Sequence, residues 1–324
     1  MSQTYLDRTQ SETFKGFLIL LIVFGHNHIL CPNTESGGLL EYLYSFHIVG
    51  FFILPFFYKQ EIALAWDKVE RTIIRTWVPY LWTCALCWLS YSIMSSHFEF
   101  GWNHIGAFFM GTQTPICHYF GYVFPWFLPT YCSFSILLLV ARKYKLAFWL
   151  ITLIGVATFF MSWIEFYRFK DTVPLGIGLA LNYFASGAIA FYANKLSPMS
   201  KYFGGVFFIV LSVCWWCNIA LGRLYQLMPV TFFLLLLCLL PHVKMSWLRL
   251  LGRNSLGIYL FNLYIINVLE RVLPHGLLGG LVLLVASVII SLLISIGINK
   301  IHILRVILFP MSRKEILSAT TNGD

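Results

Sequence analysis

The feature that most constrains this chain is the recurrence of apolar runs that are long enough to cross a lipid bilayer. A spanning helix needs about 20 predominantly apolar residues, and runs near that length recur along most of the 324 residues. Hydrophobic residues make up 59% of the sequence and charged residues only 11%, whereas soluble globular proteins carry about 25% charged residues. The sequence therefore predicts an all-α, polytopic integral membrane helical bundle.

The apolar runs predict about ten transmembrane helices. Two runs, 42–58 and 226–241, are short for a span, and the apolar piece 101–111 is expected to be interfacial or re-entrant. We expect one transmembrane domain over residues 1–310 and a polar cytoplasmic tail over 311–324. The predicted spans lie near residues 14–31, 42–58, 77–95, 122–141, 146–163, 173–192, 203–221, 226–241, 255–272 and 279–304.

The distribution of basic residues predicts which loops face the cytoplasm. Lys and Arg concentrate in the cytoplasmic loops of membrane proteins. With ten spans and both termini inside, 18 of the 22 basic residues fall on the inner side, and only Arg168, Lys170, Arg223 and Arg271 fall outside. This bias supports the predicted orientation, and it explains the net charge of +9 without a nucleic-acid partner.

The eight cysteines predict neither a disulfide framework nor a metal site. Two pairs, Cys84–Cys87 and Cys214–Cys217, have the spacing of redox or zinc motifs. Both lie in apolar runs without other ligands nearby, so we expect buried structural thiols and no bound metal. The first apolar run is followed by Cys31 and Pro32 rather than a small-residue cleavage site, so it is expected to remain as a span.

Polar side chains inside the first apolar run indicate a function, because an idle polar group is unfavourable in lipid. Lys15 and His26 are 11 residues apart, or about three turns, so they share one helix face and lie about 16 Å apart along the axis. His28 points to nearly the opposite side and is expected to belong to a different site. His47, in the second run, is expected at a depth similar to that of His26, since sequential helices are commonly neighbours. The alternative is a histidine that only bonds a backbone carbonyl.

Two arginines before the third run predict a site for an anion. Arg71 and Arg75 have i, i+4 spacing, which places both guanidinium groups on one helix face. Arginine matches the geometry of phosphate. Together with Lys15 they could form a three-cation pocket at the inner mouth of the bundle, although basic residues are common on the cytoplasmic side in any case.

The polar positions resemble, in order along the chain, the motifs of the acyltransferase-3 family of membrane acyltransferases. The nearest subgroup is similar to fucose 4-O-acetylase-like and polysaccharide O-acetyltransferase proteins. One departure is Pro55, where the family's second helix usually ends in Ser-Gly. Another departure concerns the Asp that in this family often lies a few residues before the basic residue. Here Asp7 is eight residues before Lys15, and the closer acidic residue is Glu12. The matching motifs are Lys15 with His26, Phe46-His47 with Phe51-Phe52, Arg71 and Arg75 with Pro79-Tyr80, Trp126-Phe127-Leu128, and Gly252 to Tyr259 with Asn254, Ser255 and Gly257.

The resemblance implies an O-acetyltransferase of the bacterial inner membrane, with acetyl-CoA as its co-substrate and a glycan or lipid-linked saccharide as acceptor. In this interpretation His26 is the general base that deprotonates the acceptor hydroxyl. His47 or a tyrosine would orient the acceptor or stabilise the oxyanion. Lys15, Arg71 and Arg75 would bind the CoA phosphates. Trp126 would stack on a sugar or on the CoA arm. The late motif residues would line the site or pack helices together, namely Asn254, Ser255 and Tyr259.

Several alternatives stay open from the sequence. The transfer could pass through an acetyl-His26 intermediate instead of a direct attack, and another short acyl group could replace acetyl. A transporter or flippase for a glycan or lipid-linked sugar would also suit a ten-span bundle, although no paired half-repeat is visible. A haem or metal protein using His26 and His47 is a further alternative.

Overall fold

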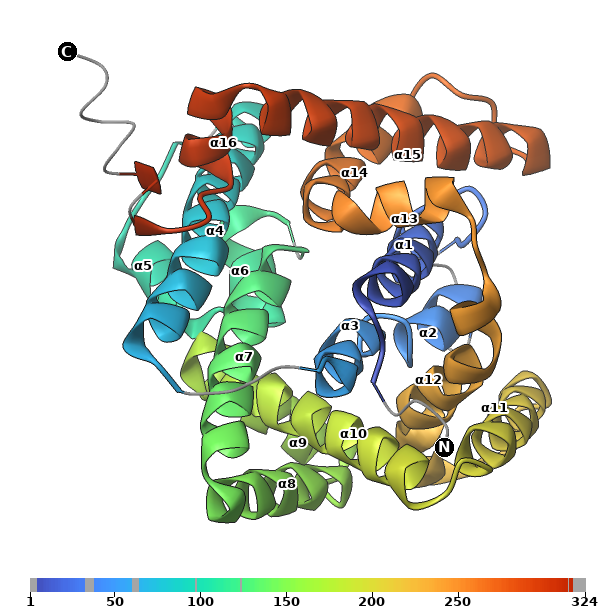
Figure 1. The fold of residues 1–324 in the computed structure, drawn as a ribbon. Helices are drawn as coiled ribbons and strands as arrows, with labels where there is room; N and C mark the ends of the chain where they lie inside the picture. The colour runs from blue at the N-terminus through green and yellow to red at the C-terminus, as the bar shows by residue number, and fades with distance from the viewer. Residues whose placement is uncertain are drawn as a thin grey trace. The chain divides into compact units, whose positions relative to one another are not determined.

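The chain is helical throughout the part that the structure describes (Figure 1). The structure is a computed structural model, and it describes residues 5–32, 38–59, 64–96, 98–122, 124–313 and 315–316. Within these ranges the only extended pairing is an isolated bridge between Leu6 and Tyr58. The predicted all-α class is therefore confirmed. Most of the predicted polar tail, 311–324, lies outside the described residues.

The first of two compact units combines the N-terminal segment Met1–Gln60 with Ser186–Gly297. Its core contains Phe14, Phe57 and Phe233, whose rings pack at centroid distances of 5.5 Å for Phe14–Phe233 and 5.3 Å for Phe57–Phe233. Its helices are α1 (Arg8–Gly25), α2 (Leu39–Tyr44), α3 (Gly50–Ile53), η1 (Leu54–Phe57), the C-terminal part of α10 (Ile177–Leu196), α11 (Ser200–Trp216), η4 (Gly222–Leu227), α12 (Met228–Leu239), η5 (Leu240–His242), α13 (Ser246–Arg253), α14 (Ser255–Leu269) and most of α15 (Leu277–Lys300).

The second compact unit combines Glu61–Ala185 with Ile298–Asp324. In its core Tyr80 stacks on Phe108 at 4.6 Å between ring centroids and donates its hydroxyl to the Phe108 carbonyl at 2.8 Å. Its helices are α4 (Trp66–Ser95), α5 (Trp102–Met110), α6 (Gln113–Phe120), η2 (Phe124–Trp126), α7 (Phe127–Lys143), α8 (Lys145–Phe159), α9 (Trp163–Thr172), η3 (Pro174–Gly176), the N-terminal part of α10, and α16 (His302–Leu308).

Side-chain hydrogen bonds determine both ends of α1. Asp7 and Gln10 form a capping box, because the Asp7 carboxylate accepts the Gln10 amide at 2.7 Å and the Gln10 side chain accepts the Asp7 amide at 3.0 Å. At the other end the buried Asn27 side chain accepts two of the following backbone N–H groups. These bonds compete with continuation of the helix. The predicted span 14–31 is therefore wrong at its end, since the helix stops at Gly25.

The prediction of a continuous second span over 42–58 is also wrong. The segment consists of the short helices α2 and α3 and the 3₁₀ helix η1, with a turn at residues 45–49. Pro55 lies at the start of η1, where its missing N–H group is tolerated. As a consequence, His47 lies in the turn between two helices rather than on a regular helix face.

The polar sequence around the apolar runs forms more helix than predicted. The predicted third span, 77–95, is the second part of α4, which begins at Trp66. The polar helix α9 and the amphipathic helix α13 were not predicted, because their residues fall between apolar runs. The apolar piece 101–111 contains the nine-residue helix α5, and its expected interfacial or re-entrant location stays a prediction.

Four helical segments among the described residues are long and apolar enough to cross a membrane by length and composition. Each coincides with one of the predicted spans, and three shorter apolar helices coincide with others. The count of ten and the cytoplasmic location of both termini stay predictions. The four segments are Phe124–Lys143, Pro174–Leu196, Gly222–His242 and Leu277–Lys300.

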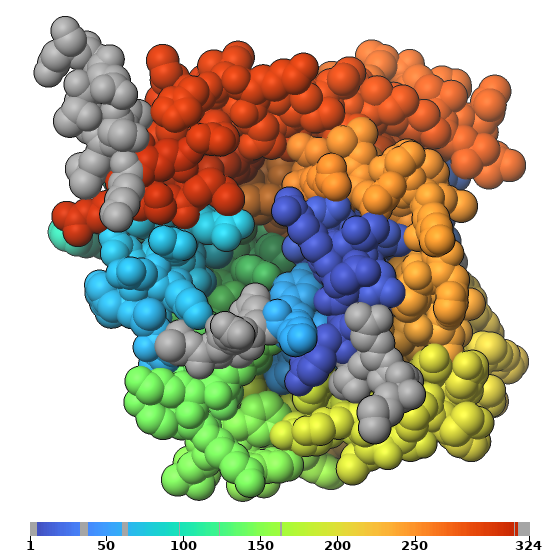
Figure 2. Space-filling model, viewed as in Figure 1, coloured from blue at the N-terminus to red at the C-terminus, as the bar shows by residue number. Residues whose placement is uncertain are grey.

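Within the first unit, α1 and α13 cross with their backbones in close contact. On the face drawn in Figure 2, the blue α1 lies directly against the orange segment that contains α13. Gly16 of α1 faces Leu248 and Gly252 of α13, and Gly252 faces the Glu12 carbonyl. A side chain at either glycine would overlap the backbone of the other helix. The two glycines therefore determine how closely α13 approaches the helix that carries Lys15 and His26.

Candidate active site

His26 lies at the C-terminal end of α1 and is held by a residue of α14. Its Nδ1 atom is 3.1 Å from Oδ1 of Asn262. His26 is half-buried, whereas Asn262 is fully buried. Because α1 ends at Gly25, His26 is the C-cap residue and its imidazole lies at the end of the helix.

The orientation of the Asn262 amide determines which nitrogen of His26 carries the proton. Asn262 Nδ2 donates to the carbonyls of Ile258 at 2.9 Å and Tyr259 at 2.6 Å. A flipped amide would place its oxygen against these two carbonyl oxygens, so Oδ1 is the atom that faces His26. An oxygen can only accept, and hence Nδ1 of His26 is the protonated nitrogen. Nε2 is left with a lone pair, as a general base requires.

The turn at residues 45–49 brings two further rings to the same end of α1. The Tyr44 ring stands edge-on to His26 at 6.1 Å between centroids and edge-on to His47 at 5.0 Å. His47 is buried, and its Nδ1–H donates to the Leu43 carbonyl. Its Nε2 is enclosed and has no hydrogen-bond partner among the described residues. Gly25 lies beside this group, and a Cβ atom at this position would make an ordinary van der Waals contact with His47 Nε2 at 4.0 Å.

His28 lies apart from this group, as its position in the sequence indicates. It is exposed, and its backbone N–H donates to the Glu270 carboxylate at 2.9 Å. The intervening Asn27 is fully buried and donates to the Gly280 carbonyl at 2.7 Å. The tight turn after α1 therefore separates the two histidines.

The predicted phosphate-binding cations are divided between the two units. Lys15 is half-buried on α1, with its ammonium 5.6 Å from the centre of the Tyr58 ring. Arg71 and Arg75 are exposed one turn apart on α4 of the second unit. Since Lys15 belongs to the first unit and the arginines to the second, the three-cation pocket stays a prediction.

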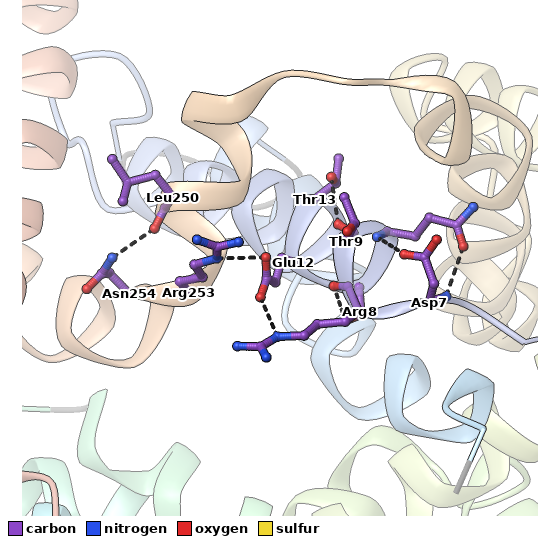
Figure 3. Close-up of polar contacts among 10 residues, drawn as sticks. Asp7, Arg8, Thr9, Glu12, Thr13, Leu250, Arg253 and Asn254 are labelled. Atoms are coloured by element: carbon purple, nitrogen blue, oxygen red, sulfur yellow. Dashed lines mark hydrogen bonds and ion pairs between the residues drawn. The ribbon is translucent and has the colours of Figure 1, made fainter.

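Glu12, the acidic residue nearest to Lys15 on its N-terminal side, connects the beginning of α1 to α13 (Figure 3). Its buried carboxylate accepts from Arg8 Nε at 3.0 Å and from Arg253 Nε at 2.8 Å. Arg253 belongs to the Gly252–Tyr259 motif. The helix α1, which carries the first motif, is therefore joined to the last motif by an ion pair as well as by the glycine contact.

The other predicted substrate residues are mostly buried. Asn254 donates to the Leu250 carbonyl at 2.9 Å and accepts the Ser295 hydroxyl at 3.1 Å, which connects α13 and α14 to α15. Ser255 is half-buried, and the carbonyl of the buried Tyr259 holds the Asn262 amide. These contacts favour the helix-packing interpretation of the motif. Trp126 is buried at the start of α7 in the second unit, with its ring edge-on to a neighbouring phenylalanine.

The cysteines and the possible metal ligands offer no other centre in the described part of the chain. Cys84 and Cys87 are buried, as predicted, but Cys214 is half-buried and Cys217 is exposed. The prediction of buried thiols is therefore wrong for the second pair, which lies at the C-terminal end of α11. No group of three or more His, Cys, Asp or Glu side chains that could hold a metal occurs among the described residues.

Asn262 is the residue of the candidate site that was not predicted from the sequence. It is the first of two amides in an otherwise apolar stretch of α14. A polar side chain in an apolar run is the same signal that indicated a function for His26. Its partner could not be predicted, because 236 residues separate the two side chains.

The chain matches a known protein family. A family model described as an acyltransferase domain matches residues 8–299, a range that includes every residue discussed above as a catalytic or binding candidate. No curated protein and no solved structure matches the chain.

Proposed function

The chain belongs to the acyltransferase-3 family of integral membrane acyltransferases, and we propose that it transfers acetyl from cytoplasmic acetyl-CoA to a hydroxyl of a cell-surface or lipid-linked glycan. The observation that carries this proposal is the contact between His26 and Asn262. It leaves the Nε2 lone pair available to remove a proton from the acceptor. The compartment that goes with this reaction is the bacterial inner membrane, with both termini in the cytoplasm.

The proposed step is a direct attack of the acceptor on the thioester. His26 Nε2 takes the proton of the sugar hydroxyl while the hydroxyl oxygen bonds to the acetyl carbonyl carbon. The bond from that carbon to sulfur then breaks, and the CoA thiolate takes the proton from Nε2. Asn262 Oδ1 stabilises the imidazolium that exists between these two transfers, because it accepts from Nδ1–H.

His47 and Tyr44 suit different parts of this reaction. His47 Nδ1–H is bonded to the Leu43 carbonyl, so its enclosed Nε2 can only accept a hydrogen bond. This supports a role in orienting the acceptor through a hydroxyl other than the reacting one, whose proton goes to His26, rather than in stabilising an oxyanion. An oxyanion needs a donor, and the Tyr44 hydroxyl, carried by the ring between the two histidines, is the group that we assign to this role.

The donor would reach His26 along α1. Lys15 lies about 16 Å from His26 along the helix axis, so the CoA diphosphate at Lys15 and the thioester at His26 would be joined by the pantetheine arm. Arg71 and Arg75 are proposed to supply further charge to the phosphates. Trp126 would stack on the acceptor or on the CoA arm, and Asn254, Ser255 and Tyr259 would support the wall of the site.

The experiment that tests this function measures free CoA released by the purified protein from acetyl-CoA, with and without a crude glycan extract. His26→Ala is compared with the parent, and His28→Ala is the matched control, since His28 is exposed two residues away. With the extract present, we expect release by the parent and by His28→Ala, but not by His26→Ala, which should still bind CoA. If the parent neither binds nor consumes acetyl-CoA, the proposal fails and glycan transport becomes the function to assay.

A further inference from the structure

The outward face of α13 forms a basic and aromatic depression that the proposed mechanism does not use. The depression has a volume of about 450 Å³, which lies within the size range of small-ligand sites. Its lining residues recur with the i, i+3, i+4 spacing of one helix face, opposite the face that packs on α1. They are Ser246, Trp247, Arg249, Leu250 and Arg253.

Two arginines on this face are prepared for an anion. Arg253 is held from one side by the Glu12 carboxylate through Nε, and its side chain is still 57% exposed. Arg249 is one turn earlier, and its Nε atom is enclosed without a hydrogen-bond partner among the described residues. A guanidinium group has five N–H donors in a planar fork that matches phosphate. The enclosed donor of Arg249 therefore lacks the acceptor that a bound phosphate would supply.

An aromatic ring lies beside the two arginines. Trp247 is 53% exposed and lines the same depression. An indole ring next to guanidinium groups can stack on a nucleobase while the arginines contact its phosphates. This combination distinguishes the face from an ordinary cluster of positive charges.

The distance from the depression to His26, measured along the axis of α1, suits a CoA molecule. Both sites belong to the same unit. The α13 helix crosses α1 at Gly16, ten residues before His26, so the two levels are about 15 Å apart along the axis of α1. An extended pantetheine arm covers a distance of this order. A molecule with its nucleotide on α13 could therefore present its thioester at the end of α1.

We infer that the α13 depression binds the adenosine 3′,5′-bisphosphate end of CoA. Trp247 stacks on the adenine, and Arg249 and Arg253 bind its phosphates. Lys15, which is one residue from Gly16 on α1, is left for the diphosphate nearer to the pantetheine arm. The inference rests on the proposed function, because it assumes that CoA is the donor.

The test measures the affinity of the full-length protein for CoA, for adenosine 3′,5′-bisphosphate and for pantetheine, in nanodiscs of phosphatidylcholine. Arg249→Gln and Trp247→Leu are compared with the parent. Lys195→Gln is the matched control, because it removes an exposed basic residue on α10, which does not line the depression. We expect Arg249→Gln to weaken the binding of CoA and of the bisphosphate by roughly 10- to 100-fold, the range for losing a hydrogen bond to a charged group. Pantetheine binding and the control should be unchanged.

The outcomes separate this inference from the proposed function. If the parent binds CoA and both α13 variants bind it equally well, the inference is overturned and the acetyl-CoA reaction stands. The phosphate bound in the depression could instead belong to a lipid, so binding of the protein to phosphatidylglycerol vesicles is measured as well. If Arg249→Gln weakens vesicle binding but not CoA binding, the depression holds a lipid headgroup and the inference is wrong. If the parent does not bind CoA in any nanodisc, the proposed function fails together with it.

Discussion

The glycine contact between α1 and α13 yields a prediction whose size follows from the structure. A Cβ atom at Gly16 would overlap the Leu248 carbonyl oxygen and lie 2.8 Å from its carbonyl carbon. Carbon atoms ordinarily approach each other to about 3.5–4.0 Å, so the helices would have to separate by at least about 0.7 Å. Neither partner is a flexible side chain, and therefore the overlap cannot be relieved by a change of rotamer.

We expect Gly16→Ala to destabilise the protein by about 2 kcal/mol or more. Overpacking of a buried contact costs about 1–3 kcal/mol, and a contact between two backbones belongs at the upper end of that range. The higher helix propensity of alanine offsets about 1 kcal/mol. The separation also lengthens the ion pair between Glu12 and Arg253, which is 2.8 Å in the structure.

The assay is thermal unfolding of the detergent-solubilised protein, followed by size-exclusion chromatography with fluorescence detection. Gly297→Ala is the matched control, because Gly297 is in α15 and a Cβ atom there would meet nothing within 4 Å. We expect this variant to be as stable as the parent or more stable. Equal melting temperatures for Gly16→Ala, Gly297→Ala and the parent would refute the close crossing of α1 and α13.

Three further predictions concern single side chains. Asn262→Leu should lower kcat for acetyl transfer by roughly 10- to 100-fold with little change in KM, since the imidazolium of His26 loses one hydrogen bond. Asn262→Asp keeps the accepting oxygen and should restore part of the rate. An equal loss of kcat in both variants would argue against a positioning role for Asn262. Glu12→Gln should cost about 1–3 kcal/mol of stability, and a double-mutant cycle with Arg253→Gln should be non-additive, whereas additive losses would show that the ion pair contributes nothing. Burial lowers the pKa of the Lys170 ammonium from its ordinary value of 10.5, so the parent should gain stability as the pH rises from the lowered pKa toward 10.5. Lys170→Met should remove that gain and leave the melting temperature at neutral pH unchanged or higher; a lower melting temperature for this variant would contradict the unfavourable burial.

The sequence predicted the helical class more successfully than the geometry around the candidate residues. Residues in long apolar runs are buried or in contact with lipid, so the positions of most helices could be predicted from these runs. The breaks in these runs could not, because they depend on individual side-chain hydrogen bonds. Just after the end of α1, the Asn27 side chain accepts from the N–H groups of Ile29 and Leu30 and donates to the distant Gly280 carbonyl. His47 lies in a turn that its own bond to Leu43 helps to form.

The polar helices were missed for a related reason. An eight-residue amphipathic helix such as α13 has low intrinsic stability, and it forms because Gly252 allows it to pack closely on α1. The sequence singled out Gly252 only as part of a motif. Likewise His26 was visible as a polar residue in lipid, but its bond to Asn262 required knowledge of how α14 packs.

A single-turnover experiment tests whether His26 acts as a base in a direct transfer. Purified protein is mixed with one equivalent of acetyl-CoA labelled in the acetyl group, first without and then with the glycan acceptor. With a direct transfer we expect no burst of free CoA without acceptor, followed by release of CoA and recovery of the label on a sugar hydroxyl when the acceptor is added. A stoichiometric burst that leaves the label on the protein would contradict it.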